Sequence, residues 1–302
     1  MSVLFLVYDR NYAYFPAVDE SIVVVENMWK QRKYQYCFWT KVLRKLRVPV
    51  GIWGKRFLGS WVSRIKEYQQ VIIFDAVYEP MIGRWLQRKK IEGYIYMWDG
   101  KNRQRLSGEQ LLPVLSFNPQ DERNGMIFQH TFFCKEILRD IEQSEKYDIY
   151  YCGRVKRRTD MILRYCTFFI KQGFFTCFHI VSGRDEKRED GIVFYEKELS
   201  YHENLVFAGQ SKAILNIVDE EEFGTVTLRC LEALYLGKKL ITNDIKIKNA
   251  DFYNKNNIFV LQSEICEEEQ GKELREFLDK EYEMPPQSIF EKYDIKNVKF
   301  GT

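Results

Sequence analysis

The segment Lys212–Leu261 reads KAILNIVDEEEFGTVTLRCLEALYLGKKLITNDIKIKNADFYNKNNIFVL, and its pattern indicates the fold class. Its apolar run Ala213–Val218 has the length and flanks of a buried strand. An acidic, glycine-containing turn follows, and apolar residues then recur at helical spacing over Leu228–Leu236. Gly237 suits a helix C-cap, and Lys239–Thr242 resembles a second short buried strand. The segment therefore predicts a strand–helix–strand unit, and such units bind ligands beyond the carboxyl ends of their strands.

The turn between this strand and helix contains residue types that bind phosphate. Gly224 lets the backbone approach a ligand closely. Thr225 and Thr227 can hydrogen-bond phosphate oxygens, and Arg229 can pair with them through two N–H groups. The helix N-terminus adds free N–H groups and a positive dipole. We therefore expect an anionic ligand at this turn.

Glu232 lies one turn into the predicted helix, between Leu231 and Ala233. A carboxylate with such neighbours should be partly buried, where it could accept hydrogen bonds from a ribose diol. The alternative is a surface glutamate near a helix start, where it is favoured by the helix dipole. Both interpretations stay open at the level of sequence.

Four segments of the chain, taken together, resemble one family. They are YIYMWDG (Tyr94–Gly100), LSFNPQDE (Leu115–Glu122), YDIYYCGRVKRRTDMIL (Tyr147–Leu163) and GTVTLRCLEALYLGKKLIT (Gly224–Thr242). In this order they are similar to GT-B glycosyltransferases of bacterial capsule, exopolysaccharide and lipopolysaccharide synthesis, particularly the CgeB-like type. Of the family's commoner E-x7-E pair only the second glutamate, Glu232, has a counterpart.

This resemblance implies an α/β protein with two Rossmann-like, doubly wound domains that face each other across a cleft. We expect an acceptor-binding domain over residues 1–133 and a nucleotide-sugar-binding domain over 146–285. The tail, 286–302, is expected to pack back on the first domain. The implied activity is transfer of a sugar from a nucleotide sugar to a glycan, one carried on a lipid, by a metal-independent hexosyltransferase-type enzyme. The alternatives are an inactive binding or scaffold protein of the same fold, or a nucleotide-sugar epimerase.

A second anion site is predicted at the start of the second domain. Tyr147–Cys152 has a strand pattern, Gly153 and Arg154 form the predicted turn, and Thr159–Lys171 is a predicted helix with Thr159 as N-cap. Arg154 and Arg158 therefore lie at a helix entrance. The resemblance puts this loop close to the donor diphosphate.

The first half of the chain has the pattern of a doubly wound α/β domain. Its predicted helices are Val18–Lys30, Phe38–Leu46 and Pro80–Lys90. Its predicted strands, each with the aspartate that follows, are Ser2–Tyr8 (Asp9), Val71–Phe74 (Asp75) and Gly93–Trp98 (Asp99). A base that deprotonates an acceptor hydroxyl would stand at such strand ends, so Asp99 and Asp75 are candidates, and so is His130 in the predicted crossover between domains. Each could instead be structural. An inverting enzyme needs this base and a retaining one does not.

Charge is distributed unevenly although the net charge is only +3. Residues 28–105 contain 18 Lys or Arg against 5 Asp or Glu. With Trp39, Trp53, Trp61 and Trp85, these bases suit an anionic membrane surface or a lipid-diphosphate acceptor. A solvated basic surface is the alternative. No nucleic-acid motif is present, and we expect no nucleic-acid partner.

Composition and missing motifs narrow the function classes. The 302 residues, 45% of them hydrophobic, can fill two cores. The seven scattered cysteines include no C-x-x-C pair, as expected for reduced thiols in the cytoplasm. No glycine-rich dinucleotide motif, Walker sequence or Asp-x-Asp after a strand occurs, so we expect neither metal nor cofactor beside the nucleotide sugar. No secretory or membrane-spanning segment is predicted, which favours a cytoplasmic protein that can lie at the inner membrane face.

Overall fold

The computed structural model of the protein divides into two compact units. Unit 1 comprises Met1–His130 together with Ile295–Thr302, and unit 2 comprises Thr131–Asp294. The structure describes residues 3–98, 106, 110–154, 158–183, 185–187, 192–262 and 266–301.

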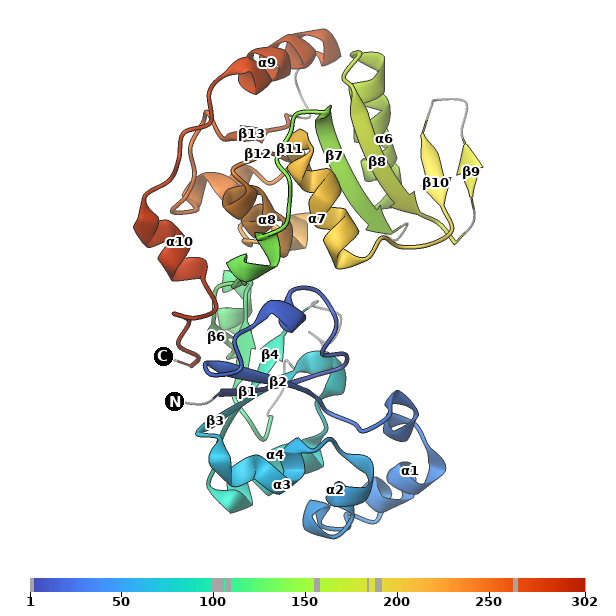
Figure 1. Ribbon diagram of the computed structural model, residues 1–302, viewed down its shortest axis with the longest axis vertical. Coiled ribbons are helices and arrows are strands. Elements are labelled where there is room, and N and C mark those ends of the chain that lie inside the picture. The colour runs from blue at the N-terminus through green and yellow to red at the C-terminus, as the bar shows by residue number, and fades with distance from the viewer. Residues whose placement is uncertain are drawn as a thin grey trace. The chain divides into compact units, whose positions relative to one another are not determined.

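Unit 1 is built on a six-stranded sheet in which all the described pairings are parallel (Figure 1). The order is β2-β1-β3-β4-β5-β6, and the strands are β1 (Val3–Val7), β2 (Val23–Asn27), β3 (Gln70–Phe74), β4 (Glu92–Met97), β5 (Val114–Ser116) and β6 (Ile127–Phe128). The central strands β1 and β3 are apolar throughout their inner residues, as parallel strands covered on both faces must be. The three strands predicted in this half are confirmed as β1, β3 and β4.

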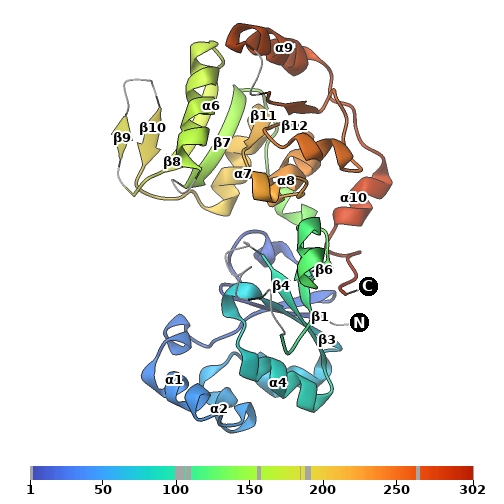
Figure 2. The same cartoon turned by 180° about the vertical axis from the view of Figure 1, so that it is seen from behind.

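Helices cover one face of this sheet, as both ribbon views show (Figures 1 and 2). They are α1 (Phe38–Lys45), α2 (Val50–Phe57), α3 (Trp61–Arg64) and α4 (Pro80–Lys89). Short 3-10 turns join the elements at η1 (Phe15–Ala17), η2 (Arg32–Gln35), η3 (Ile65–Glu67), η4 (Asp75–Val77) and η5 (Pro119–Asn124). The predicted helices at α1 and α4 are confirmed. Of the tryptophans expected at a membrane, Trp53 and Trp61 are buried in the core and only Trp39 is exposed.

The helix predicted over Val18–Lys30 is wrong. Residues Val23–Asn27 form strand β2, which pairs in parallel with β1 in the register Val3↔Val23. The run Ile22–Val25 consists only of β-branched residues, whose χ1 restriction disfavours helix and favours strand. The apolar spacing suited a helix, but this local preference and the open edge of β1 decide the outcome.

The C-terminal residues of the chain belong to unit 1. Phe300 is only 4% exposed, and its ring lies edge-on to Phe5 of β1 with 5.3 Å between the ring centroids. The side-chain amide of Gln70 donates to the carbonyl of Phe300 (3.2 Å). A side chain at Gly301 would collide with the ring of Tyr94. Residues distant in sequence thus complete the core of unit 1.

Unit 2 is built on a seven-stranded sheet in the order β13-β12-β11-β7-β8-β10-β9, parallel except for β9. The strands are β7 (Tyr147–Arg154), β8 (Thr176–Val181), β9 (Glu186–Lys187), β10 (Val193–Tyr195), β11 (Ser211–Asn216), β12 (Lys239–Thr242) and β13 (Ile258–Val260). Helices α6 (Thr159–Lys171) and α9 (Glu267–Asp279) pack on one face through a continuous apolar core. Helices α7 (Tyr201–Gly209) and α8 (Leu228–Leu236) contact each other and cover the other face.

Local signals account for most of unit 2. Helix α8 and strand β12 have the predicted bounds, and Gly237 adopts the left-handed C-cap conformation (φ 63°). Helix α6 also has its predicted bounds, but Arg158 occupies the N-cap position that was predicted for Thr159. The turn predicted at Gly153 and Arg154 is wrong, because both residues continue strand β7 alongside β8.

The remaining elements are η6 (Lys135–Leu138), η7 (Glu220–Glu222), η8 (Ile245–Asn249) and α10 (Gln287–Tyr293). Within the described ranges, no helix has the length and apolar character needed to cross a membrane.

Candidate functional site

Three neighbouring strands of unit 2 end at one edge of its sheet. The parallel strands β12, β11 and β7 have their carboxyl ends at Thr242, Asn216 and Arg154. In open α/β sheets, ligands bind beyond the carboxyl ends of the strands. The segments that follow these ends contain most of the predicted donor-site residues.

The loop between β11 and α8 is held in shape by a buried aspartate. Gly224 has φ 88°, a conformation that disfavours residues with a Cβ, and its N–H donates to Oδ2 of Asp244 (2.7 Å). The other carboxylate oxygen of Asp244 accepts the N–H of Lys246 (2.8 Å). Burial raises the pKa of Asp244, while these backbone hydrogen bonds oppose that effect. Asp244 thus positions the loop.

A second contact joins the ends of β11 and β12. The Asn243 side chain accepts the N–H of Val218 (2.9 Å) through Oδ1 and donates to the carbonyl of Val218 (2.8 Å) through Nδ2. The amide therefore clamps the two loops together. Asn243 and Asp244 come directly after a predicted strand, so the sequence indicates that both lie at this edge. Only the structure shows which backbone groups they bind.

The two threonines of the loop have different surroundings. Thr225 is buried, and its hydroxyl donates to the carbonyl of Glu222 (2.6 Å), so it shapes the turn. Thr227 is the N-cap residue of α8, yet its hydroxyl donates to Oδ1 of Asn216 (3.2 Å) and does not cap the helix. The first N–H groups of a helix have no acceptor within it. At α8 they are thus left without a side-chain cap from Thr227.

Two arginines lie at the same edge. Arg229 donates through Nη2 to the carbonyl of Cys152 (2.7 Å), and its guanidinium lies 5.1 Å from the centroid of the Tyr151 ring. Arg158 donates to the carbonyl of Ile217 and lies 3.7 Å from the carboxylate of Glu222. These contacts fix both cations beside the ends of β7 and β11.

Glu232 is only 6% exposed, so the surface-glutamate interpretation is wrong. Burial raises the pKa of its carboxyl group, whereas the charge of Arg229 and the nearby polar side chains of Tyr201 and Asn204 act to lower it. Asn204 also accepts a hydrogen bond from the hydroxyl of Tyr150 (2.9 Å). A buried polar network therefore joins β7, α7 and α8, and Tyr201 and Asn204 are members that carried no sequence signal.

Gly153 and Arg154 contribute in different ways. A Cβ at Gly153 would lie 2.5 Å from the hydroxyl oxygen of Tyr151, so glycine leaves room for that ring under Arg229. Arg154 is more than half exposed and pairs with the equally exposed Glu198. Such surface ion pairs contribute about 0–1 kcal/mol to stability.

The candidate bases belong to unit 1. Asp75 is 0% exposed, begins the η4 turn and accepts the backbone N–H of Trp98 (3.2 Å). A carboxylate in this position links the ends of β3 and β4, and it cannot meet an acceptor without a local movement. His130 is half-buried, two residues after β6. Asp99 lies outside the described residues. The choice of base stays a prediction.

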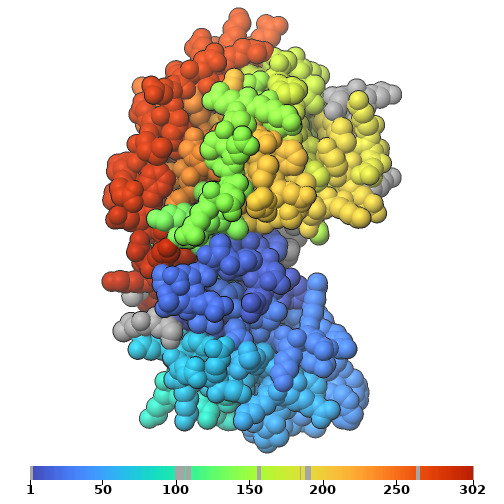
Figure 3. All heavy atoms as spheres, viewed as in Figure 1, coloured from blue at the N-terminus to red at the C-terminus, as the bar shows by residue number. Residues whose placement is uncertain are grey.

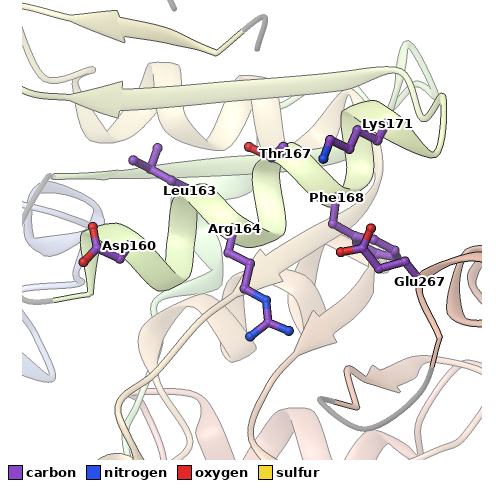
Figure 4. A pocket seen from close by; sticks show the side chains of 7 residues that line it. All are labelled: Asp160, Leu163, Arg164, Thr167, Phe168, Lys171 and Glu267. Carbon is purple, nitrogen blue, oxygen red and sulfur yellow. The ribbon is translucent and has the colours of Figure 1, made fainter.

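A groove of about 370 Å³ lies between α6 and α9 (Figure 4). Two acids, Asp160 and Glu267, and two bases, Arg164 and Lys171, line it. The close view shows these four side chains at different points along the groove. The charges balance, and none of the predicted site residues lines the groove. In the part of the chain that the structure describes, no three His, Cys, Asp or Glu residues are grouped so as to hold a metal ion.

Comparisons with known proteins find similarity in structure but not in sequence. No protein-family model and no curated protein matches the chain. A glycosyltransferase from Rickettsia africae is 9% identical, covers 92% of this chain and 89% of its own, and superposes with a TM-score of 0.53. UDP-GlcNAc 2-epimerase from Methanocaldococcus jannaschii is also 9% identical, covers 99% and 97%, and gives a TM-score of 0.52. TarM is 13% identical with a TM-score of 0.44, and the match spans 53% of its length. The protein thus has the GT-B fold, with two Rossmann-like α/β domains.

Proposed function

We propose that the protein is a glycosyltransferase that transfers a sugar from a nucleotide donor to a glycan acceptor in bacterial surface-polysaccharide synthesis. The observation that carries the proposal is the buried carboxylate of Glu232 beside Arg229. It lies one turn from the N-terminus of α8, which has no side-chain cap. This arrangement offers an acceptor for a sugar diol and donors for a diphosphate a short distance apart.

Donor binding would use the edge formed by β12, β11 and β7. The diphosphate would lie against the N-terminus of α8, where Gly224 permits close approach of the backbone. Arg229 and Arg158 would supply positive charge. Arg154, which pairs with Glu198 at the surface, would add a further positive charge for a phosphate oxygen. Glu232 would accept hydrogen bonds from the ribose hydroxyls.

In the reaction, an acceptor hydroxyl forms a bond to the anomeric carbon while the bond from that carbon to the diphosphate breaks. Charge develops on the leaving diphosphate, and the helix N-terminus and arginines are placed in advance to stabilise it, without a metal in this proposal. An inverting enzyme would use Asp99, Asp75 or His130 to accept the hydroxyl proton. A retaining enzyme would use none of them.

The acceptor is proposed to be a glycan on a lipid carrier at the membrane. The support is the excess of Lys and Arg over Asp and Glu between residues 28 and 105, which make up most of the helical layer of unit 1. Basic surfaces of this kind are attracted to anionic leaflets and to lipid diphosphates.

Thermal stabilisation by nucleotide sugars tests the proposal. UDP, GDP and CMP sugars are screened against the wild-type protein and against Glu232→Ala. At least one donor should raise the melting temperature of the wild type and leave the variant unchanged. Slow hydrolysis of that donor would support a transferase. Interconversion of two sugars would indicate an epimerase instead, and no response to any donor would favour a scaffold protein.

A further inference from the structure

Unit 1 contains a groove of about 540 Å³ whose polar lining is strongly cationic. It lies where the end of α1, the start of α2 and one side of α4 meet. Four arginines and one glutamate line it together with apolar side chains: Arg44, Arg47, Arg84, Arg88, Glu79, Val48, Pro49, Val50, Pro80, Met81 and Trp85. The volume lies within the range of small-molecule sites, about 300–1,000 Å³.

Among the described residues, only Arg44 of these four arginines has an acidic partner. Arg44 pairs with Glu79 and donates to the backbone carbonyls of Thr40 (3.2 Å) and Gln35 (2.7 Å). Arg44 is therefore part of the wall of the groove. Its partner Glu79 is the only acid among the described residues that line the groove, where the arginines outnumber it.

Arg47, Arg84 and Arg88 make no ion pair or side-chain hydrogen bond with another described residue. Arg84 and Arg88 stand four residues apart on α4, so their side chains share one face of the helix. Like charges in this spacing destabilise a helix. Three guanidinium groups around one groove repel each other and so oppose folding. An anion bound between them would neutralise this repulsion.

Arg47 also occupies a position that favours glycine. It has φ 53° and follows the C-cap of α1, where the N–H of Val48 donates to the carbonyl of Leu43 (3.0 Å) and closes a Schellman motif. Glycine is the usual residue in this left-handed conformation because a Cβ is disfavoured there. The arginine at this position therefore carries a conformational cost that glycine would not.

Large apolar side chains of the α1–α2 segment, which contributes to the groove lining, are exposed. Leu46 is 70% exposed and Ile52 is 74% exposed, and each lies within two residues of the groove lining. Phe38 and Trp39 at the start of α1 are exposed as well. The space-filling view shows the blue α1–α2 region on the surface of unit 1 (Figure 3). Exposed apolar groups next to unpaired cations match a ligand with both a charged and an apolar part.

We propose that this groove binds the phosphate of an anionic lipid headgroup, while Leu46, Ile52, Phe38 and Trp39 enter the interfacial layer of the bilayer. Arginine suits phosphate because its planar fork matches two phosphate oxygens. The inference extends the acceptor side of the proposed function, and it does not require a donor in unit 2.

Vesicle flotation tests this inference with the full chain. Vesicles of phosphatidylcholine alone are compared with vesicles that also contain phosphatidylglycerol, and we expect binding only to the second kind. Arg47→Gly should weaken that binding about fivefold or more, the effect of about 1 kcal/mol per basic residue near an anionic surface. Its melting temperature should be unchanged or higher, because glycine suits the backbone at this position. Leu46→Ser with Ile52→Ser should also weaken binding.

A matched control separates the groove from diffuse attraction. Lys66→Gln removes one charge from the exposed surface of unit 1 outside the groove and should change vesicle binding less than twofold, because it removes no phosphate contact. An equal loss with Lys66→Gln and Arg47→Gly would overturn the site. So would equal binding to vesicles of phosphatidylcholine alone and to vesicles that contain phosphatidylglycerol, since the groove would then not recognise the anionic headgroup. Inorganic phosphate that binds in solution without any vesicle binding would identify a free-phosphate site and would also overturn the lipid assignment. Glu232→Gln should float like the wild type, so a failure of donor binding is distinguished from a failure of this site.

Discussion

The substitution Glu232→Gln separates binding from stability at the candidate donor site. Glutamine keeps the shape and one carbonyl oxygen, so it can still face the polar side chains of Tyr201 and Asn204, but it removes the buried charge. A hydrogen bond to a charged group contributes about 1.5–3 kcal/mol, so the variant should bind its nucleotide sugar about 10- to 150-fold more weakly. Isothermal titration calorimetry with the donor found in the thermal screen measures this loss.

The stability of Glu232→Gln relative to the wild type should rise with pH. Burial raises the pKa of Glu232 in the folded protein above its value in the unfolded chain. The folded state therefore holds the proton more tightly, and the wild type loses stability as the pH rises from the unfolded pKa through the folded one. Glutamine does not titrate, so the melting temperature of Glu232→Gln relative to wild type should increase between pH 4.5 and pH 8.

The exposed Glu273 of α9 supplies the control, because Glu273→Gln removes a charge from unit 2 and should change neither donor affinity nor this pH profile. Unchanged donor affinity in Glu232→Gln would refute the ribose contact. A loss of affinity that merely follows a loss of stability would show that Glu232 is a structural residue.

Four further substitutions test the structure of the two units. Gly224→Ala should cost about 1–2 kcal/mol because of its positive φ and should weaken donor binding, whereas Gly237→Ala should cost a similar amount with donor affinity intact; calorimetry and thermal melts compare them. Asp244→Ala leaves the N–H of Gly224 without its acceptor and should cost about 1–3 kcal/mol in urea unfolding, with weaker donor binding. Phe300→Ala empties a core position against Phe5 and should cost about 3–5 kcal/mol; a change below 1 kcal/mol would show that the C-terminal residues are not part of the core of unit 1.

The sequence predicts a helix or strand of this fold correctly where residues within that element determine its structure. Helix α8 and its C-cap Gly237 were predicted to the residue because apolar spacing and a positive-φ glycine are local. The failure over Val18–Lys30 arose where a local pattern suited two structures and pairing with β1 decided between them. The packing of Phe300 against Phe5 joins residues almost 300 positions apart, and no local signal reports it.

At the candidate site, sequence predicted which residues gather but not what their atoms contact. Gly224, Arg229 and Glu232 follow a predicted strand, so their common location could be foreseen. That Thr225 turns its hydroxyl inward while Gly153 makes room for the ring of Tyr151 depends on side-chain packing across three strands. Such contacts are tertiary, and hydrophobic periodicity carries no information about them.

The distribution of buried polar groups in unit 2 gives a reason for expecting a ligand at this edge. Asn216, Thr242, Asp244 and Glu232 are all buried at or beside the carboxyl ends of β11 and β12, while the opposite face of the sheet packs through an apolar core. Burying a charged group such as the carboxylate of Asp244 or Glu232 is costly even when it is paired, and apolar residues of similar volume often serve folding as well or better. Residues that lower the stability of the fold are expected where a protein binds a ligand or catalyses a reaction. The polar cluster at this edge therefore favours a binding site over a purely structural network, and Glu232→Gln distinguishes the two.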